Sequence, residues 1–157
     1  MKHRIIFICT GNSCRSQIAE GLLQKEAGNK FDIFSAGSHP SRLHPAAISV
    51  MEEWGIDISH QKSESIANFI DKNIDTIITV CDNANESCPV FPNEKIRLHW
   101  SIKDPFHGWG NEQEDLPPYR IARDELKKRI DKFLSSKNID LSLIHISEPT
   151  RRYAIWY

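Results

Sequence analysis

Short apolar runs alternate along this chain with stretches of helical periodicity. Residues 5–8 are all apolar and residues 75–80 are largely apolar and β-branched, as is typical of strands buried on both faces. Residues 17–27 instead carry apolar side chains at helical spacing. The pattern predicts strands at residues 4–8, 31–36, 75–80 and 95–100, and helices at residues 17–27, 45–54, 63–69 and from Pro117 or Pro118 to Phe133.

This alternation of strands and helices predicts an open, mostly parallel α/β sheet of four strands, flanked by helices. A chain of 157 residues is long enough for one such domain and short for two. Ligands of such sheets bind beyond the carboxyl ends of the strands. Cys9 and Cys81 each follow a predicted strand, so both thiols are expected at that edge.

The character of the sequence changes near Ser136. All the predicted elements lie in residues 1–136, which we expect to form a single catalytic domain. Residues 137–157 are in part apolar and show no pattern that would pack them against the domain. We therefore expect residues 137–157 to be a disordered or non-native C-terminal tail.

Composition narrows the possible partners and compartment. A hydrophobic content of 39%, a charged content of 26% and a net charge of -1 favour neither nucleic-acid nor membrane binding. The first predicted strand follows the N-terminus too closely for a signal peptide, so we expect a cytoplasmic protein. We also expect a monomer. In that compartment cysteines are more often catalytic, redox-active or metal-binding than structural; the chain has Cys9, Cys14, Cys81 and Cys88.

The segment between the first strand and the first helix has the most specific pattern in the chain. Backbone N–H groups and a helix N-terminus there attract a tetrahedral oxyanion, Arg15 can bind two of its oxygens, and the same field favours a thiolate at Cys9. A core cysteine beside a surface arginine is the simpler alternative, but it does not account for the joint spacing. We interpret Cys14 as structural. The segment reads Cys9-Thr10-Gly11-Asn12-Ser13-Cys14-Arg15-Ser16.

Cys81 and Cys88 form a second cluster, separated by a polar segment. Their spacing does not match a zinc site, and no other cysteine or histidine pair completes one. A redox pair that joins only during turnover is the interpretation we favour over an incidental pair. On one helix the two thiols would be about 10 Å apart along the axis, so the segment would have to unwind for them to meet.

A general acid is expected opposite the nucleophile. Asp104, stiffened by Pro105 and placed beyond a predicted strand, is the best candidate. An ordinary Asp-Pro turn explains the same two residues equally well.

Five motifs together resemble the thioredoxin-coupled arsenate reductases, which share the fold of the low-molecular-weight protein tyrosine phosphatases. The resemblance covers residues 2–134, and the pair Cys81 and Cys88 is its most specific feature, since phosphatases of this fold do not need it. The motifs are CTGNSCRSQIAEG from Cys9, SAG from Ser35, GIDIS from Gly55, TVCDNANESCPVFP from Thr79, and His99-Trp100 with Asp104-Pro105.

The resemblance implies a relay of three thiols. The Cys9 thiolate attacks arsenate held by the loop and Arg15, Asp104 protonates the departing oxygen, and Ser16 keeps Cys9 ionised. Cys81 then attacks Cys9 and releases arsenite. Cys88 attacks Cys81 in turn, and thioredoxin reduces the resulting disulfide, with no tightly bound cofactor implied.

The resemblance also implies a potassium ion beside the loop, as some members of that family bind one. The matching positions are Asn12, Glu20, Ser35 and Glu64, where Glu64 replaces an expected aspartate. Residues 106–118 are longer than the family pattern, and could cover the active site or alter the choice of reductant.

Two other functions stay open at this point. A low-molecular-weight tyrosine phosphatase would use the same loop to hydrolyse phosphotyrosine or small phosphoesters through a Cys9 phosphocysteine. A non-catalytic redox sensor or oxyanion-binding protein would keep the loop and show no turnover. Among reductases, glutaredoxin with glutathione is an alternative to thioredoxin.

We predict that a chain truncated after Ser136 keeps the melting temperature and the activity of the full chain, because the core elements all precede that residue. Thermal unfolding and turnover of the two chains check this. A lower melting temperature or a loss of turnover would show that the tail contributes to the folded enzyme.

Overall fold

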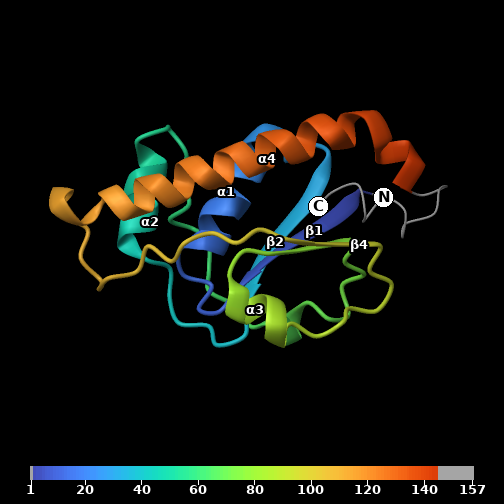
Figure 1. Ribbon diagram of the computed structural model, residues 1–157, viewed down its shortest axis with the longest axis horizontal. Coiled ribbons are helices and arrows are strands. Elements are labelled where there is room, and N and C mark those ends of the chain that lie inside the picture. The colour runs from blue at the N-terminus through green and yellow to red at the C-terminus, as the bar shows by residue number, and fades with distance from the viewer. Residues whose placement is uncertain (1, 145–157) are drawn as a thin grey trace.

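The computed structural model describes residues 2–144, with side chains from residue 2 to residue 136. Four parallel strands form one sheet in the order β2-β1-β3-β4 (Figure 1). The strands are β1 (His3–Cys9), β2 (Phe31–Gly37), β3 (Thr76–Thr79) and β4 (Ile96–His99). The helices are α1 (Arg15–Ala27), α2 (Pro45–Glu52), α3 (Asp82–Ser87) and α4 (Pro117–Ile144), with 3₁₀ turns η1 (Ile66–Asn68) and η2 (Gln113–Asp115).

Strand β1 lies inside the sheet because its residues from Ile5 to Cys9 are all apolar and buried. It pairs with β2 on one side and with β3 on the other. Cys9 ends β1 opposite Gly37, the last residue of β2. The chain thus reverses its direction of winding at β1, and Cys9 lies at the edge where ligands of such sheets bind.

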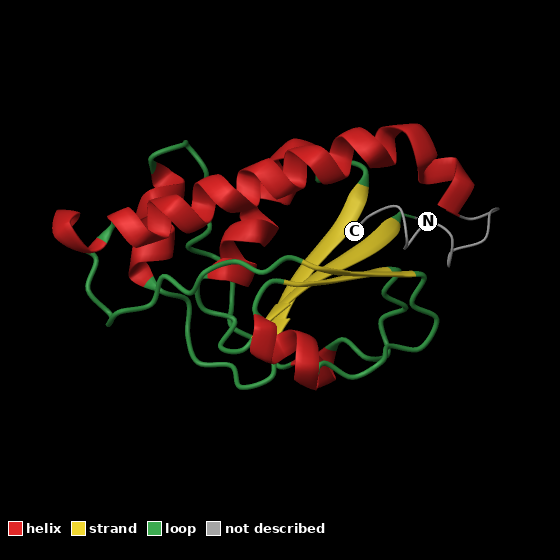
Figure 2. Cartoon of the chain, in the orientation of Figure 1, coloured by secondary structure: helices red, strands yellow, loops and turns green. Residues whose placement is uncertain are grey.

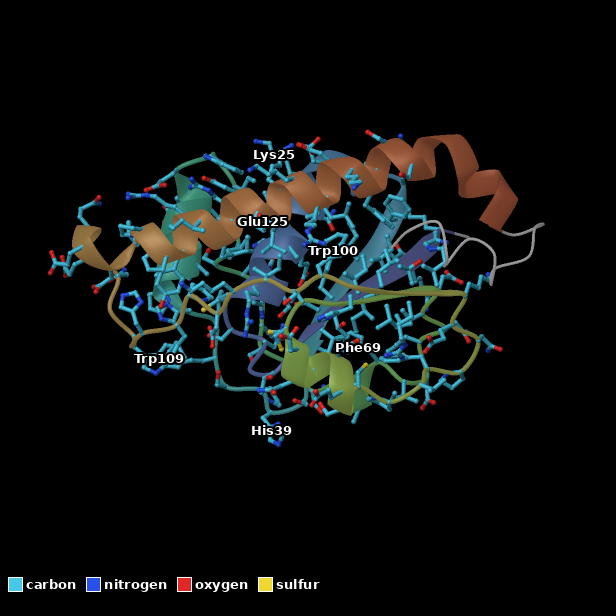
Figure 3. The ribbon with its side chains drawn as sticks, in the orientation of Figure 1. Lys25, His39, Phe69, Trp100, Trp109 and Glu125 are labelled. Carbon is cyan, nitrogen blue, oxygen red and sulfur yellow. The ribbon has the colours of Figure 1, made fainter. Side chains whose placement is uncertain are left out.

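Helices α1, α2 and α4 lie together on one side of the sheet, and α3 lies by the ends of the strands (Figures 1 and 2). The side chain of Trp100 lies between α4 and the sheet (Figure 3). Its ring meets Phe133 of α4 at 6.3 Å between centroids, and Phe133 also contacts Phe31 of β2 at 6.4 Å. These contacts fix α4 across the sheet and complete one hydrophobic core.

The structure confirms the predicted fold class and all four strands, with small differences at their ends. The prediction of a helix at residues 63–69 was wrong, because only η1 forms there. The Ser65 hydroxyl caps that single turn by accepting from the Ala67 N–H at 3.2 Å, and Ser65 also bridges to Gly37 of β2. Helix α3 has no counterpart among the predicted elements, because its six polar and small residues show no apolar periodicity.

Helix α4 continues to Ile144, so it extends into the expected tail of residues 137–157. The rest of that tail lies outside the described residues, and its dispensability stays a prediction. Within residues 2–144, no helix has the length and apolarity needed to cross a membrane.

Candidate active site

The backbone carbonyls of the loop from Cys9 to Cys14 all accept hydrogen bonds from outside the loop's concave side. With the carbonyls turned outward, the peptide N–H groups of the loop are turned toward the volume before α1, which is the arrangement of an anion-binding nest. The donors are Ser38 N to Cys9 O (3.3 Å), His39 N to Thr10 O (2.8 Å), Ser41 N to Gly11 O (3.0 Å), Gln17 Nε2 to Asn12 O (3.0 Å), His44 N to Ser13 O (3.1 Å) and Ile18 N to Cys14 O (2.8 Å).

Two residues allow the loop to make this turn. Asn12 has a φ of 47°, in the left-handed region that asparagine adopts more readily than most residues. Gly37 lies so close that a Cβ there would come within 2.5 Å of the Thr10 oxygen and 2.9 Å of the Asn12 nitrogen. The end of β2 therefore packs directly against the loop, and only glycine fits at that contact.

Two donors point at the sulfur of Cys9. The Asn12 backbone N–H donates to Cys9 Sγ at 3.2 Å, and Ser16 Oγ lies 2.9 Å from the same sulfur. Asn12 Nδ2 donates to Ser16 Oγ at 2.8 Å, so the hydroxyl hydrogen of Ser16 is free to point at Cys9. This arrangement stabilises negative charge on the sulfur.

Arg15 and Asp104 lie together at the rim of the loop. Arg15 Nη1 donates to the Ile102 carbonyl at 2.9 Å, and Nη2 lies 3.7 Å from Asp104 Oδ2. The Asp104 side chain is 61% exposed, while that of Arg15 is 13% exposed. Both groups are thus anchored by the segment after β4, with an accessible carboxyl next to a fixed cation.

Cys81 also lies beside the loop. Its sulfur lies 3.4 Å from the Thr10 hydroxyl and accepts from the Ala84 N–H at 3.4 Å, which makes Cys81 the N-cap of α3. The Ala84 contact places this buried thiol at the N-terminus of α3, and the Thr10 contact places it beside the loop. The second thiol therefore lies next to the residue that follows Cys9.

Cys88 is the C-cap of α3, at the opposite end of the helix from Cys81. The rise of the intervening residues separates the two positions by about 10 Å, so no disulfide can form while α3 is intact. Burial raises the pKa of Cys88, opposed by the guanidinium of Arg97. The structure brings Cys9, Arg15, Ser16, Cys81 and Asp104 to one edge of the sheet, and leaves Cys88 apart.

Cys14 is buried at the start of α1, and this burial raises its pKa to about 12. It is therefore a neutral thiol at physiological pH, in contrast to the nucleophile expected at Cys9.

Oxygen atoms gather behind the loop at the four positions expected to hold potassium. Ser35 Oγ donates to Glu20 Oε1 at 2.6 Å and accepts from Asn12 Nδ2 at 3.0 Å, while Asn12 Oδ1 accepts from the Glu64 N–H at 2.8 Å. Burial, together with the charge of Glu64, raises the pKa of Glu20 to about 7, although the Ser35 bond opposes the shift. Two carboxyl groups and two neutral oxygens suit a hard cation.

Residues that the sequence analysis did not single out hold the loop from behind. Gln17 Nε2 bonds both the Asn12 carbonyl and the Lys62 carbonyl, and Gln61 Nε2 donates to Gln17 Oε1 at 2.7 Å. The Ser63 hydroxyl donates to the Gly11 carbonyl at 3.0 Å. Nothing in the local sequence marks these contacts, since all but the Gln17–Asn12 bond join residues 44 to 52 positions apart.

The longer segment of residues 106–118 packs against His44, whose own N–H bonds the loop at Ser13. The Trp109 ring stacks on His44 at 4.8 Å, and Phe106 meets it edge-on at 5.8 Å. His44 Nδ1 accepts from the Ala46 N–H, so Nε2 carries the hydrogen and donates to the Gly108 carbonyl at 2.7 Å. Figure 3 shows Trp109 in this segment, on the side of α2. The segment therefore supports one side of the loop.

Known proteins of similar sequence cover most of this chain. The family described as low molecular weight phosphotyrosine protein phosphatase matches residues 4–142. An arsenate reductase of Halalkalibacterium halodurans is 42% identical over 132 residues, which are 84% of this chain and 95% of that protein.

Two solved structures have the same fold. An arsenate reductase in the phosphate binding state superposes with a TM-score of 0.72 and 36% identity, over 87% of this chain and 98% of that one. A thioredoxin-dependent arsenate reductase of Corynebacterium glutamicum superposes with a TM-score of 0.71 and 26% identity, over 88% of this chain and 63% of that one.

The raised pKa of Glu20 predicts how stability depends on pH. In potassium-free buffer the folded chain binds the Glu20 proton more tightly than the unfolded chain, so the free energy of unfolding falls as pH rises from 4.5 to about 7. The substitution Glu20→Gln should remove about 2 kcal/mol of this fall. Urea unfolding of both proteins at pH 5 and pH 8 checks it, and equal pH dependence in the two would refute the assignment.

Proposed function

We propose that this chain, which belongs to the low molecular weight phosphotyrosine protein phosphatase family, reduces arsenate to arsenite with thiols as the electron source. The observation that carries the proposal is the position of Cys81, at the N-terminus of α3 and 3.4 Å from the Thr10 hydroxyl. A phosphatase needs only a nucleophile, an oxyanion loop and an acid. A second thiol next to that loop, with a third at the far end of the same short helix, serves a redox reaction.

The first step takes place in the loop. An arsenate ion would lie against the N–H groups before α1 and against the donors of Arg15 that its bond to Ile102 does not occupy. The Cys9 sulfur, supported by Ser16 and the Asn12 N–H, attacks arsenic. Asp104, accessible beside Arg15, supplies the proton with which the displaced oxygen leaves as water.

The second step uses the thiol at the N-terminus of α3. Cys81 attacks the sulfur of Cys9, a bond between the two sulfurs forms, and the bond from Cys9 to arsenic breaks. The electron pair of that bond stays on arsenic, which leaves as arsenite. Two thiols have then become one disulfide, which balances the two-electron reduction of arsenate.

The third step requires a conformational change. Cys88 attacks Cys81, and Cys9 leaves as a thiolate, but this demands that α3 unwind because the helix separates the two residues. A single short helix of polar and small residues has few apolar contacts to lose. We propose that thioredoxin reduces the Cys81–Cys88 disulfide, as expected for a chain similar to a thioredoxin-dependent arsenate reductase.

A potassium ion is also proposed behind the loop, held by oxygens of Asn12, Glu20, Ser35 and Glu64. Bound there, the cation would keep Glu20 ionised and the Asn12 side chain in place. Asn12 would then continue to orient Ser16 toward Cys9.

We further propose that the protein acts in the cytoplasm as a monomer. A relay of free thiols needs a reducing compartment. One chain supplies all the groups of the proposed mechanism, since Cys9, Arg15, Cys81 and Asp104 meet at one edge of its own sheet.

The test is NADPH consumption by the purified protein with arsenate, thioredoxin and thioredoxin reductase. We expect sustained consumption from the wild type. The Cys88→Ser variant should release about one arsenite per chain and then stop, because its Cys9–Cys81 disulfide cannot be passed on.

Two controls accompany this assay. Glutaredoxin with glutathione replaces thioredoxin, and consumption with that pair alone would reassign the reductant. Hydrolysis of nitrophenyl phosphate is measured in parallel. No consumption with either pair, combined with brisk ester hydrolysis that survives Cys88→Ser, would establish a phosphatase and refute the reductase.

A further inference from the structure

Strand β4 contacts the segment around α3 at both of its ends. Arg97 and His99 are two residues apart on β4 and therefore point to the same face of the strand. His99 Nε2 lies 2.8 Å from Asp82 Oδ1 at the start of α3. Arg97 Nη2 donates to the Pro89 carbonyl, just beyond the end of α3, at 2.8 Å. One rigid strand thus positions the whole segment between Cys81 and Cys88.

Arg97 also contacts the third thiol itself. The Cys88 sulfur and Arg97 Nη2 both donate to the Pro89 carbonyl, at 3.5 Å and 2.8 Å, and the guanidinium hydrogen bonds to the Cys88 side chain. Glu94 holds the guanidinium in place through Nε at 2.9 Å and Nη2 at 2.7 Å. The position of the cation next to the sulfur is therefore fixed by two further groups.

The charges around Cys88 act in opposite directions. Burial raises the pKa of this thiol, the Arg97 guanidinium lowers it, and the Glu94 carboxylate raises it again. Glu94 itself stays ionised, because hydrogen bonds from Arg97 and the Phe91 N–H lower its pKa despite partial burial. The turn before β4 and β4 itself thus supply one anion and one cation that face the sulfur.

We propose that Arg97 is a positioning residue for Cys88, which it holds at the end of α3 and supplies with positive charge as the thiol loses its proton. Glu94 limits this effect, so that Cys88 stays protonated until it is used. The role rests on the proposed relay. In that step the Cys88 proton passes to solvent, the Cys88 thiolate bonds to the Cys81 sulfur, and the Cys81–Cys9 bond breaks with its electron pair on Cys9.

Two substitutions with opposite expected effects test the proposal. The reduced protein is treated with iodoacetamide across a range of pH, and the rate of modification at Cys88 is followed by fragment-ion mass spectrometry. Arg97→Gln should lower the rate at pH 7.5 about tenfold, as expected for a pKa raised by one unit. Glu94→Gln, an isosteric change, should increase the rate. Arg97→Lys keeps the positive charge, so its rate of modification at Cys88 should lie between the rates of the wild type and of Arg97→Gln.

A purely structural role for Arg97 makes a different prediction. Loss of either Arg97 or Glu94 would then loosen the segment and change the reactivity of Cys88 in the same direction. The same direction for both variants, or an unchanged pH profile in Arg97→Gln, would overturn the proposal. If Arg97→Gln fails to fold, as judged by circular dichroism, Arg97→Lys and Glu94→Gln still decide it by the direction of their shifts.

The relay supplies an independent readout. In a chain loaded with the Cys9–Cys81 disulfide, Arg97→Gln should slow the appearance of the Cys9 thiol at pH 7.5, and raising the pH should restore the rate. A slowed rate that no pH restores would overturn the proposal. Alkylation needs neither arsenate nor thioredoxin. An unchanged alkylation profile in Arg97→Gln would therefore refute the role of Arg97 and leave the proposed function standing. Absence of arsenate turnover in the wild type would refute the proposed function itself.

Discussion

The outward hydrogen bonding of the Cys9–Cys14 carbonyls is the constraint on which the rest of the site depends. Each carbonyl that is bonded on the outside turns a peptide N–H toward the inside, and together these groups create a positive concave surface without a metal ion. The donors come from the segment after β2, from α1 and from His44. The end of β2 can approach so closely only because Gly37 has no side chain.

The three thiols of the proposed relay lie in surroundings of unequal rigidity. Cys9 ends the central strand and Cys81 follows β3, so the sheet fixes both. Cys88 instead ends the short helix α3, beside Arg97 and Pro89, and is partly buried against the core. A reaction that passes a disulfide outward requires this difference: the groups that bind the anion must not move, and the last thiol must.

The aromatic segment after Asp104 adds a second support. His44 lies between Trp109, Tyr119 and the loop, and its burial lowers its pKa, so the ring stays neutral and keeps its bonds to Ala46 and Gly108. The segment that carries the candidate acid is thereby attached to the same residue that supports the loop at Ser13. This attachment couples the position of the acid to that of the anion site.

Much of this protein could be predicted without a structure because its strongest signals are local. The apolar run before Cys9, the spacing from Cys9 to Arg15 and the helical periodicity after it are properties of neighbouring residues, and they predicted the parallel sheet and the position of the loop. The expectation that Cys88 must move to reach Cys81 also came from their seven-residue spacing and the rise of a helix. The local signals failed where the pattern was weak, at the 3₁₀ turn η1 and at the polar helix α3.

What remained hidden depends on contacts between residues far apart in the sequence. Gln61 and Ser63 lie outside the motifs, and no local pattern marks the role of Gln17 within its own motif, since the function of all three comes from the groups that the fold brings to them. The raised pKa of Glu20 and the opposing charges at Cys88 arise from burial and from neighbours on other elements. Neither burial nor distance is a property of a residue type, so only the packed chain could decide them.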